Sequence, residues 1–130
     1  MMNADFETHA VVGSTAVDFW FNVGVATEFP DNGGLCFKHE QLQIAVFNFS
    51  HRNEWYACQN LCPHRMQMAL SRGIIGSQSD EPKVACPFHK RSFSLRDGQC
   101  MNGDEPAIVT FPVKVEDGIV YVGLSKKMLN

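Results

Sequence analysis

Two short stretches of the chain each combine a cysteine with a histidine, residue types that bind metals through sulfur and nitrogen. The first is Cys62-Pro63-His64 and the second is Cys86-Pro87-Phe88-His89. A proline follows the cysteine in both, and residues 65–85 separate the two stretches. One such stretch would be weak evidence for a site. Two with the same order of residue types predict a shared metal centre whose ligands are Cys62, His64, Cys86 and His89.

Two kinds of metal centre use two cysteines and two histidines. A Rieske centre holds a 2Fe–2S cluster, with two thiolates on one iron and two imidazoles on the other. A structural zinc site can use the same side chains around one ion, but its usual spacing keeps the cysteines together and the histidines together. Here each stretch supplies one residue of each type, which favours iron–sulfur. Zinc remains an alternative, as does a pair of buried cysteines acting only as small apolar residues.

The size and composition of the chain fit one domain with a buried core. Of its 130 residues, 19% are charged and the formal net charge is −3, which suits a soluble protein with no nucleic-acid partner. No apolar run approaches the roughly 18 residues of a membrane helix, and no secretory signal is evident. We expect a cytoplasmic protein with a lead-in at 1–16, one domain at 17–125 and a tail at 126–130.

Three further cysteines, Cys36, Cys58 and Cys100, lie outside the two stretches. An odd number left over argues against a disulfide framework. This agrees with a reducing compartment, where disulfides are rare. We expect Cys58 to be a buried strand thiol and Cys100 to be packed rather than reactive.

The basic residues are concentrated in the part of the chain that carries the candidate ligands. Residues 61–99 hold six Lys and Arg against three Asp and Glu, whereas residues 1–60 hold two against seven. These cations, among them Lys90 and Arg91, have two interpretations that remain equally open. They are either ordinary solvated loop charges or a means to offset the charge of a cluster and attract an acidic partner surface.

Short runs of β-forming residues separated by turn residues predict an all-β fold. The Asp117-Gly118 pair between the last two runs favours a hairpin turn with positive φ. A brief helical turn is expected only within residues 64–73. The runs that we expect as strands are 17–23, 33–39, 42–49, 55–58, 83–86, 92–95, 113–115 and 119–124.

The candidate ligands lie on two hairpin-like loops, which must close over the metal from both sides. Residues 103–106 are placed to form a third covering loop, although an ordinary surface turn explains this stretch at least as well. Met66, Met68 and Phe88 are expected to shield the centre from water.

Several stretches together resemble a Rieske ferredoxin domain, and the similarity runs from about Trp20 to Leu124. This resemblance implies an all-β Rieske-type domain of short antiparallel strands, with a cluster-binding subdomain of two ligand loops. It also implies a 2Fe–2S cluster on the four candidate ligands. The extra cysteines with which some respiratory-type members link their loops are absent here. The stretches that carry the resemblance are residues 60–65, 70–74, 86–89, 93–98 and 112–124.

Within the Rieske set, residues 71–76 and 92–101 and the long gap between the ligand stretches are most similar to the small subunit of assimilatory NAD(P)H-dependent nitrite reductase. The resemblance implies an electron-transfer subunit of an oxidoreductase, without a complete active site of its own. It implies a large partner subunit with flavin and siroheme that reduces nitrite to ammonia. Two alternatives stay open: a separate Rieske ferredoxin that serves an aromatic-ring oxygenase, and a zinc-binding assembly module.

Overall fold

The computed structural model describes residues 17–64, 66–88 and 90–125, which form short antiparallel strands and two short 3₁₀ helices. The all-β prediction is therefore confirmed. The expected lead-in at 1–16 and tail at 126–130 lie outside the described residues. None of the helices in the described part reaches the length and apolarity that a membrane crossing requires. The elements are β1 (Phe19–Val25), η1 (Ala26–Glu28), β2 (Gly33–His39), β3 (Leu42–Phe49), β4 (Glu54–Gln59), β5 (Leu61–Cys62), β6 (Gln67–Met68), η2 (Leu70–Arg72), β7 (Ile74–Gln78), β8 (Glu81–Ala85), β9 (Ser92–Ser94), β10 (Thr110–Phe111), β11 (Val113–Glu116) and β12 (Ile119–Leu124).

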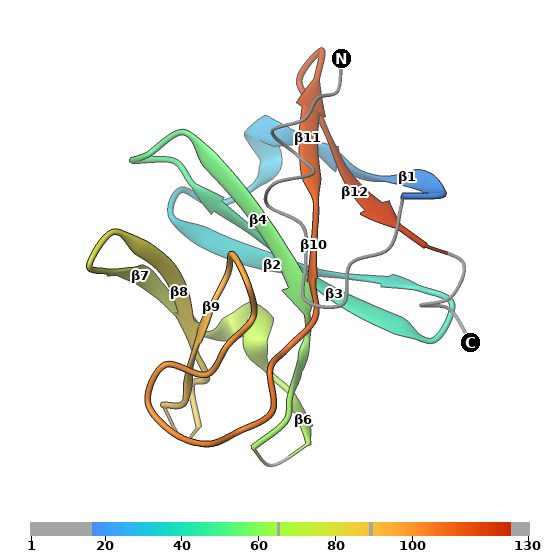
Figure 1. The fold of residues 1–130 in the computed structure, drawn as a ribbon. Coiled ribbons are helices and arrows are strands. Elements are labelled where there is room, and N and C mark those ends of the chain that lie inside the picture. Colours follow the sequence, from blue (N-terminus) through green and yellow to red (C-terminus); the bar gives the residue numbers. More distant parts are fainter. Residues whose placement is uncertain (1–16, 65, 89, 126–130) are drawn as a thin grey trace.

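The strands form four sheets. Sheet A has the order β1-β12-β11, and sheet B has the order β10-β4-β3-β2. Sheet C is the small β5-β6 hairpin, and sheet D has the order β7-β8-β9. Sheet B crosses the middle of the molecule, with sheet A at one end and the loops and strands of sheets C and D at the other (Figure 1).

Strand β3 separates two hydrophobic cores because successive side chains of a strand point to opposite faces. Ile44 and Val46 belong to a first core, which sheets A and B share. Ala45, Phe47 and Phe49 belong to a second core on the other face. Burial on both faces explains why the sequence of this strand is almost continuously apolar.

The second core joins sheet B to the strands that carry the candidate ligands. From sheet B it takes Phe47, Phe49 and Tyr56, and from sheet D it takes Val84 and Phe93. Each of these side chains is at most 3% exposed. The ligand loops are therefore attached to the rest of the domain through a close-packed apolar contact.

A glycine allows strand β2 to lie close to this core. A Cβ atom on Gly34 would come within 2.5 Å of the Phe47 ring and 3.1 Å of the Ser71 carbonyl oxygen. Any side chain at this position would therefore separate β2 from β3 and from helix η2. Because η2 follows the first ligand loop, Gly34 keeps that loop near the central sheet.

The sequence predicted the long strands best. The predicted strands at 33–39 and 42–49 match β2 and β3 at both ends, and the predicted run at 119–124 matches β12. Asp117 and Gly118 both have positive φ, 53° and 78°, so the predicted hairpin turn is confirmed. The brief helical turn expected within residues 64–73 is η2.

Other boundaries differ from the prediction. The first strand runs from Phe19 to Val25 rather than over 17–23, because its pairing with β12 continues past a bulge at Asn22–Gly24. Strand β7 was not predicted at all. It is an edge strand of sheet D that pairs only with β8.

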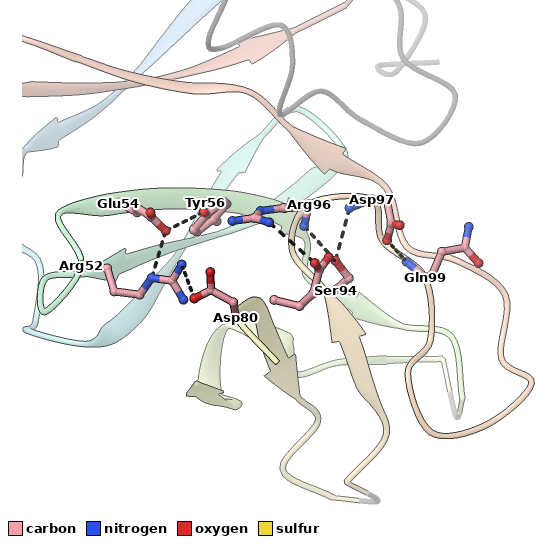
Figure 2. A network of polar contacts seen from close by, with 9 residues as sticks. Arg52, Glu54, Tyr56, Asp80, Ser94, Arg96, Asp97 and Gln99 are labelled. Carbon is pink, nitrogen blue, oxygen red and sulfur yellow. Dashed lines mark hydrogen bonds and ion pairs between the residues drawn. The ribbon is translucent and has the colours of Figure 1, made fainter. Parts of the chain in front are cut away.

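A chain of polar contacts runs along the junction of sheets B and D (Figure 2). The Tyr56 hydroxyl donates to Glu54 over 2.7 Å, and Arg52 lies 3.3 Å from the same carboxylate. Arg52 also reaches Asp80 in the β7–β8 turn, at 3.4 Å. Burial, together with the hydrogen bond to Glu54, raises the pKa of Tyr56 to about 12. The hydroxyl thus remains protonated and serves as a donor at this junction.

We expect Tyr56→Phe to destabilise the domain by about 1 kcal/mol, because a buried hydroxyl loses its hydrogen bond to Glu54. The free energy of unfolding from urea denaturation measures this effect. Tyr121→Phe is the matched control, since the Tyr121 hydroxyl makes no hydrogen bond within the described part of the chain. The contact of Tyr121 with Lys114 involves the aromatic ring, which phenylalanine keeps. Equal stability of the two variants would show that the Tyr56 hydroxyl does not strengthen the junction.

Candidate metal centre

The first ligand stretch forms the turn of sheet C. Strand β5 places Cys62 opposite Gln67 of β6, and the chain reverses between them. Met66 has a left-handed φ of 53° in this tight turn. The Cys62 side chain is fully buried, whereas the His64 side chain is 19% exposed. The turn therefore directs a thiol inward and keeps an imidazole at the rim.

Asn60 closes the base of this first loop. Its backbone carbonyl accepts from the amides of Ala69 and Leu70, each at 3.0 Å, and its side-chain oxygen accepts from the Ser71 amide at 2.7 Å. Its side-chain nitrogen donates to Gln43 of β3 at 3.0 Å. The buried Asn60 thus connects the two ends of the loop to each other and to the central sheet through its backbone carbonyl and its side chain.

The second ligand stretch connects β8 to β9. The Cys86 amide donates to the Arg91 carbonyl at 2.8 Å, and the Lys90 amide donates to the Cys86 carbonyl at 2.9 Å. Lys90 has a left-handed φ of 61°, which allows this tight reversal. Cys86 is 1% exposed. His89 lies outside the described residues.

The structure brings Cys62 and Cys86 into the same buried core. Both belong to the second hydrophobic core, and neither forms a disulfide. Leu70 and Phe93 of this core are also fully buried. The described residues thus supply two buried thiols and one partly exposed imidazole, which are the donor types of a Rieske iron–sulfur cluster. The donor set described here therefore fits a 2Fe–2S group.

The predicted third loop, residues 103–106, contacts His64 through Glu105. The Glu105 carboxylate accepts from Nδ1–H of His64 at 2.8 Å and from Nε–H of Arg91 at 3.1 Å, and both distances end on Oε2. These two hydrogen bonds, with the positive charge of Arg91, lower the pKa of Glu105. Metal-bound histidines commonly donate a ring N–H to a carboxylate. The sequence identified 103–106 only as a covering loop or surface turn, and it did not indicate a role for Glu105.

Three side chains that we expected to shield the centre from water are exposed instead. Met66, Met68 and Phe88 are 69%, 46% and 52% exposed. The guanidinium of Arg72 lies 5.8 Å from the centre of the Phe88 ring. The chain therefore presents apolar surface at both ligand loops, next to an exposed cation.

The remaining cysteines are placed away from a ligand role. Cys58 is fully buried, as predicted, and burial raises the pKa of its thiol. Cys100 is half-buried and pairs through its backbone with Phe93. Cys36 is exposed on the edge strand β2.

Comparison with known proteins identifies similar chains. A family model described as "Rieske-like [2Fe-2S] domain" matches residues 19–123. The nitrite reductase (NADH) small subunit of Salmonella typhimurium is 31% identical over 103 residues, which cover 79% of this chain and 95% of that protein. The solved structure of the E. coli protein NirD matches with a TM-score of 0.74 at 28% identity, covering 83% of this chain and 98% of that one.

A second type of relative is about equally similar. The 3-phenylpropionate/cinnamic acid dioxygenase ferredoxin subunit of Photorhabdus laumondii is 32% identical over 102 residues, which cover 77% of this chain and 90% of that protein. Much longer relatives also match. The chain spans 10% of a nitrite reductase [NAD(P)H] large subunit from Klebsiella oxytoca and 8% of a nitrite reductase [NAD(P)H] from Emericella nidulans.

We expect Asn60→Ala to destabilise the domain by about 1–3 kcal/mol, because the Ser71 amide loses its partner at a buried position. Urea denaturation followed by circular dichroism gives the free energy of unfolding. Gln67→Ala is the control, since Gln67 is exposed and belongs to the same loop. If the two substitutions cost the same, Asn60 does not hold the loop in the way described.

Proposed function

This chain belongs to the Rieske-like [2Fe–2S] domain family, and we propose that it is the electron-transfer small subunit of an NAD(P)H-dependent nitrite reductase. The observation that carries the proposal is the match to a curated small subunit over 95% of that protein's length. The burial of Cys62 and Cys86 in one core supports it. Such a subunit contributes to an oxidoreductase without a complete active site of its own.

The four candidate ligands have distinct roles in this proposal. When bound, the cluster supplies a one-electron redox centre. Cys62 and Cys86 would bind one iron as thiolates and keep it away from water, in agreement with their burial. His64 and His89 would bind the other iron. Because His64 lies at the rim, its imidazole would lie between the buried centre and a docked partner.

The surface at the ligand loops suits a protein partner. Exposed Met66, Met68 and Phe88 provide apolar contact area, and the charged side chains nearby include Arg72 and the exposed Lys90. Arg91 is less available, because Glu105 accepts from its guanidinium. A partner with acidic groups around an apolar docking site would match this surface.

We propose that this partner is the large subunit of the reductase, with flavin and siroheme, and that nitrite is reduced to ammonia there. Electrons from NAD(P)H would pass between that subunit and this chain. We propose the cytoplasm as the location. Cys36, Cys58, Cys86 and Cys100 form no disulfide, which agrees with a reducing compartment.

A Rieske ferredoxin of a ring-oxygenase system is the second candidate, favoured by the similarity to the Photorhabdus ferredoxin subunit. An assay with purified partners separates the two. We expect the cluster-loaded chain to stimulate NAD(P)H-dependent nitrite reduction by a large subunit from the same genome. Turnover with an oxygenase, and none with the nitrite reductase, would favour the ferredoxin.

We expect Cys86→Ser and His64→Ala to abolish cluster binding while much of the β fold remains. The visible absorbance of the cluster and the EPR signal of its reduced form measure binding, and far-ultraviolet circular dichroism measures the fold. Cys36→Ser is the control and should keep both signals, because Cys36 is an exposed residue of strand β2 and lies outside both candidate ligand stretches. Wild-type spectra in Cys86→Ser would refute the ligand assignment.

We expect Lys90→Glu to weaken coupling to the partner and to reduce its dependence on salt, while the cluster stays bound. Exposed charges lose most of their long-range effect beyond a Debye length of about 8 Å at physiological ionic strength, so rates should be compared at low and high salt. Lys38→Glu on β2 is the control, since it makes the same change at an exposed position of a strand without candidate ligands. Equal rates for the two variants at low salt would exclude Lys90 from docking.

A further inference from the structure

The polar contacts drawn in Figure 2 lie at the end of sheet D opposite the second ligand stretch. Asp80 comes directly before β8, and Cys86 comes directly after it. A strand rises about 3.3 Å per residue, so these two positions are about 20 Å apart along the strand. Sheet D therefore has a candidate ligand at one end of β8 and charged side chains at the other.

Two arginines cross the junction between sheets B and D in opposite directions. Arg52, in the β3–β4 turn, lies 3.4 Å from the carboxylate of Asp80 in the β7–β8 turn. Arg96, which follows β9, is hydrogen-bonded to the Tyr56 hydroxyl of β4, and that hydroxyl donates to Glu54 over 2.7 Å. Burial disfavours the charged form of Arg96, but Tyr56 and the nearby carboxylates outweigh this effect and raise its pKa. Each side of the junction thus supplies a cation to a partner on the other side.

Neighbours within sheet D direct Arg96 toward sheet B. Glu81 of β8 lies 3.7 Å from the Arg96 guanidinium and also accepts from the Ser94 hydroxyl of β9. The Leu95 amide donates to the Pro82 carbonyl at 2.9 Å, and the Leu95 side chain is buried in the second core. The backbone on which Arg96 is mounted is therefore fixed to β8.

The apolar contact between the two sheets lies closer to the ligands. Val84 and Phe93 contribute to it from sheet D, and Val84 is two positions before Cys86. Burial of apolar surface favours contact but has no preferred direction. A second, directional contact at the far end of β8 limits rotation of sheet D about the apolar contact. Two ion contacts that cross in opposite directions also oppose sliding of one sheet along the other.

We propose that this junction network sets the orientation of sheet D on sheet B, and that Asp80 and Arg96 are thereby positioning residues for Cys86. The inference rests on the proposed ligand assignment. The Asp80 and Arg96 side chains are 89% and 43% exposed, and exposed ion pairs contribute little to the free energy of unfolding. We therefore expect loss of the network to affect cluster retention more than stability. The network consists of Arg52, Glu54, Tyr56, Asp80, Glu81 and Arg96.

Asp80→Asn and Arg96→Gln each remove one of the two crossing contacts, and the double variant removes both. Asparagine tolerates the left-handed φ of 70° at position 80, so the β7–β8 turn is kept. We expect the double variant to lose iron to a chelator about 5-fold faster than the wild type, the factor that a lost contact of modest strength gives. Each single variant should lose iron more slowly than the double variant, because one contact still limits the rotation. Arg96→Lys keeps the charge and should recover most of the retention.

Glu116→Gln is the matched control. It removes a carboxylate that is 62% exposed and lies 3.5 Å from Lys114, but both residues belong to β11 of sheet A. Iron loss from this variant should equal that of the wild type. The measurements use the full chain loaded with cluster, and the EPR spectrum of the reduced cluster should broaden in the double variant only.

Hydrogen exchange of backbone amides, read by mass spectrometry, tests the network without relying on the cluster. In the double variant we expect faster exchange in β8 and β9 and unchanged exchange in sheet A. Iron loss at the wild-type rate would overturn the positioning role. Exchange that rises equally in sheets A and D would also overturn it, since that result indicates a general loss of stability.

If the double variant does not fold, the two single variants and Arg96→Lys still decide between these outcomes. A wild-type chain that takes up no cluster would instead refute the proposed function, and the exchange of sheet D would still show whether the network orients it. Failure of the network is thus distinguishable from failure of the proposed function.

Discussion

The packing of the ligand-bearing hairpins on one face of β3 and β4 is the contact on which the site depends. Sheet C is a two-stranded hairpin, which is marginally stable alone, and the three-stranded sheet D needs a packed hydrophobic face. Cys62 and Cys86 lie within the core that attaches these sheets to Phe47 and Phe49. The two thiols therefore share one core through packing, and we expect a change that loosens this core to alter the distance between these candidate ligands.

The sequence predicted the strands whose signal is local. Strand β3 is almost continuously apolar, and β2 follows a run of turn residues at 30–34, so their bounds follow from side-chain type alone. Strand β7 ends in glycine and polar residues and exposes Ile74 at 69%, so its sequence resembles a loop. Strands β5 and β6 have two residues each and exist only through their pairing. Such elements depend on the fold around them and have no pattern of their own.

The candidate site also has features that the sequence predicts and features that it does not. The Cys and His spacing is a local signal and identified the candidate ligands directly. The contact between His64 and Glu105 joins residues 41 positions apart, and no spacing rule connects them. Residue type alone did not show whether Met66, Met68 and Phe88 are buried or exposed. An apolar side chain near a metal can exclude water from it, or it can form part of an exposed surface that contacts a partner. Only the path of the backbone decides between them.

Basic side chains that count equally in the composition have different surroundings in the structure. Lys90 and Arg91 contribute equally to the basic excess of residues 61–99, yet only Lys90 is exposed, while Arg91 donates to Glu105. The Glu105 carboxylate accepts from both His64 and Arg91, so the charge of Arg91 is paired within the chain. Lys90 and Arg72 lie at the surface, where their charge would act on the proposed partner. Two neighbouring cations that the composition counts alike therefore differ in the structure: Arg91 is paired within the chain, and Lys90 is exposed to solvent.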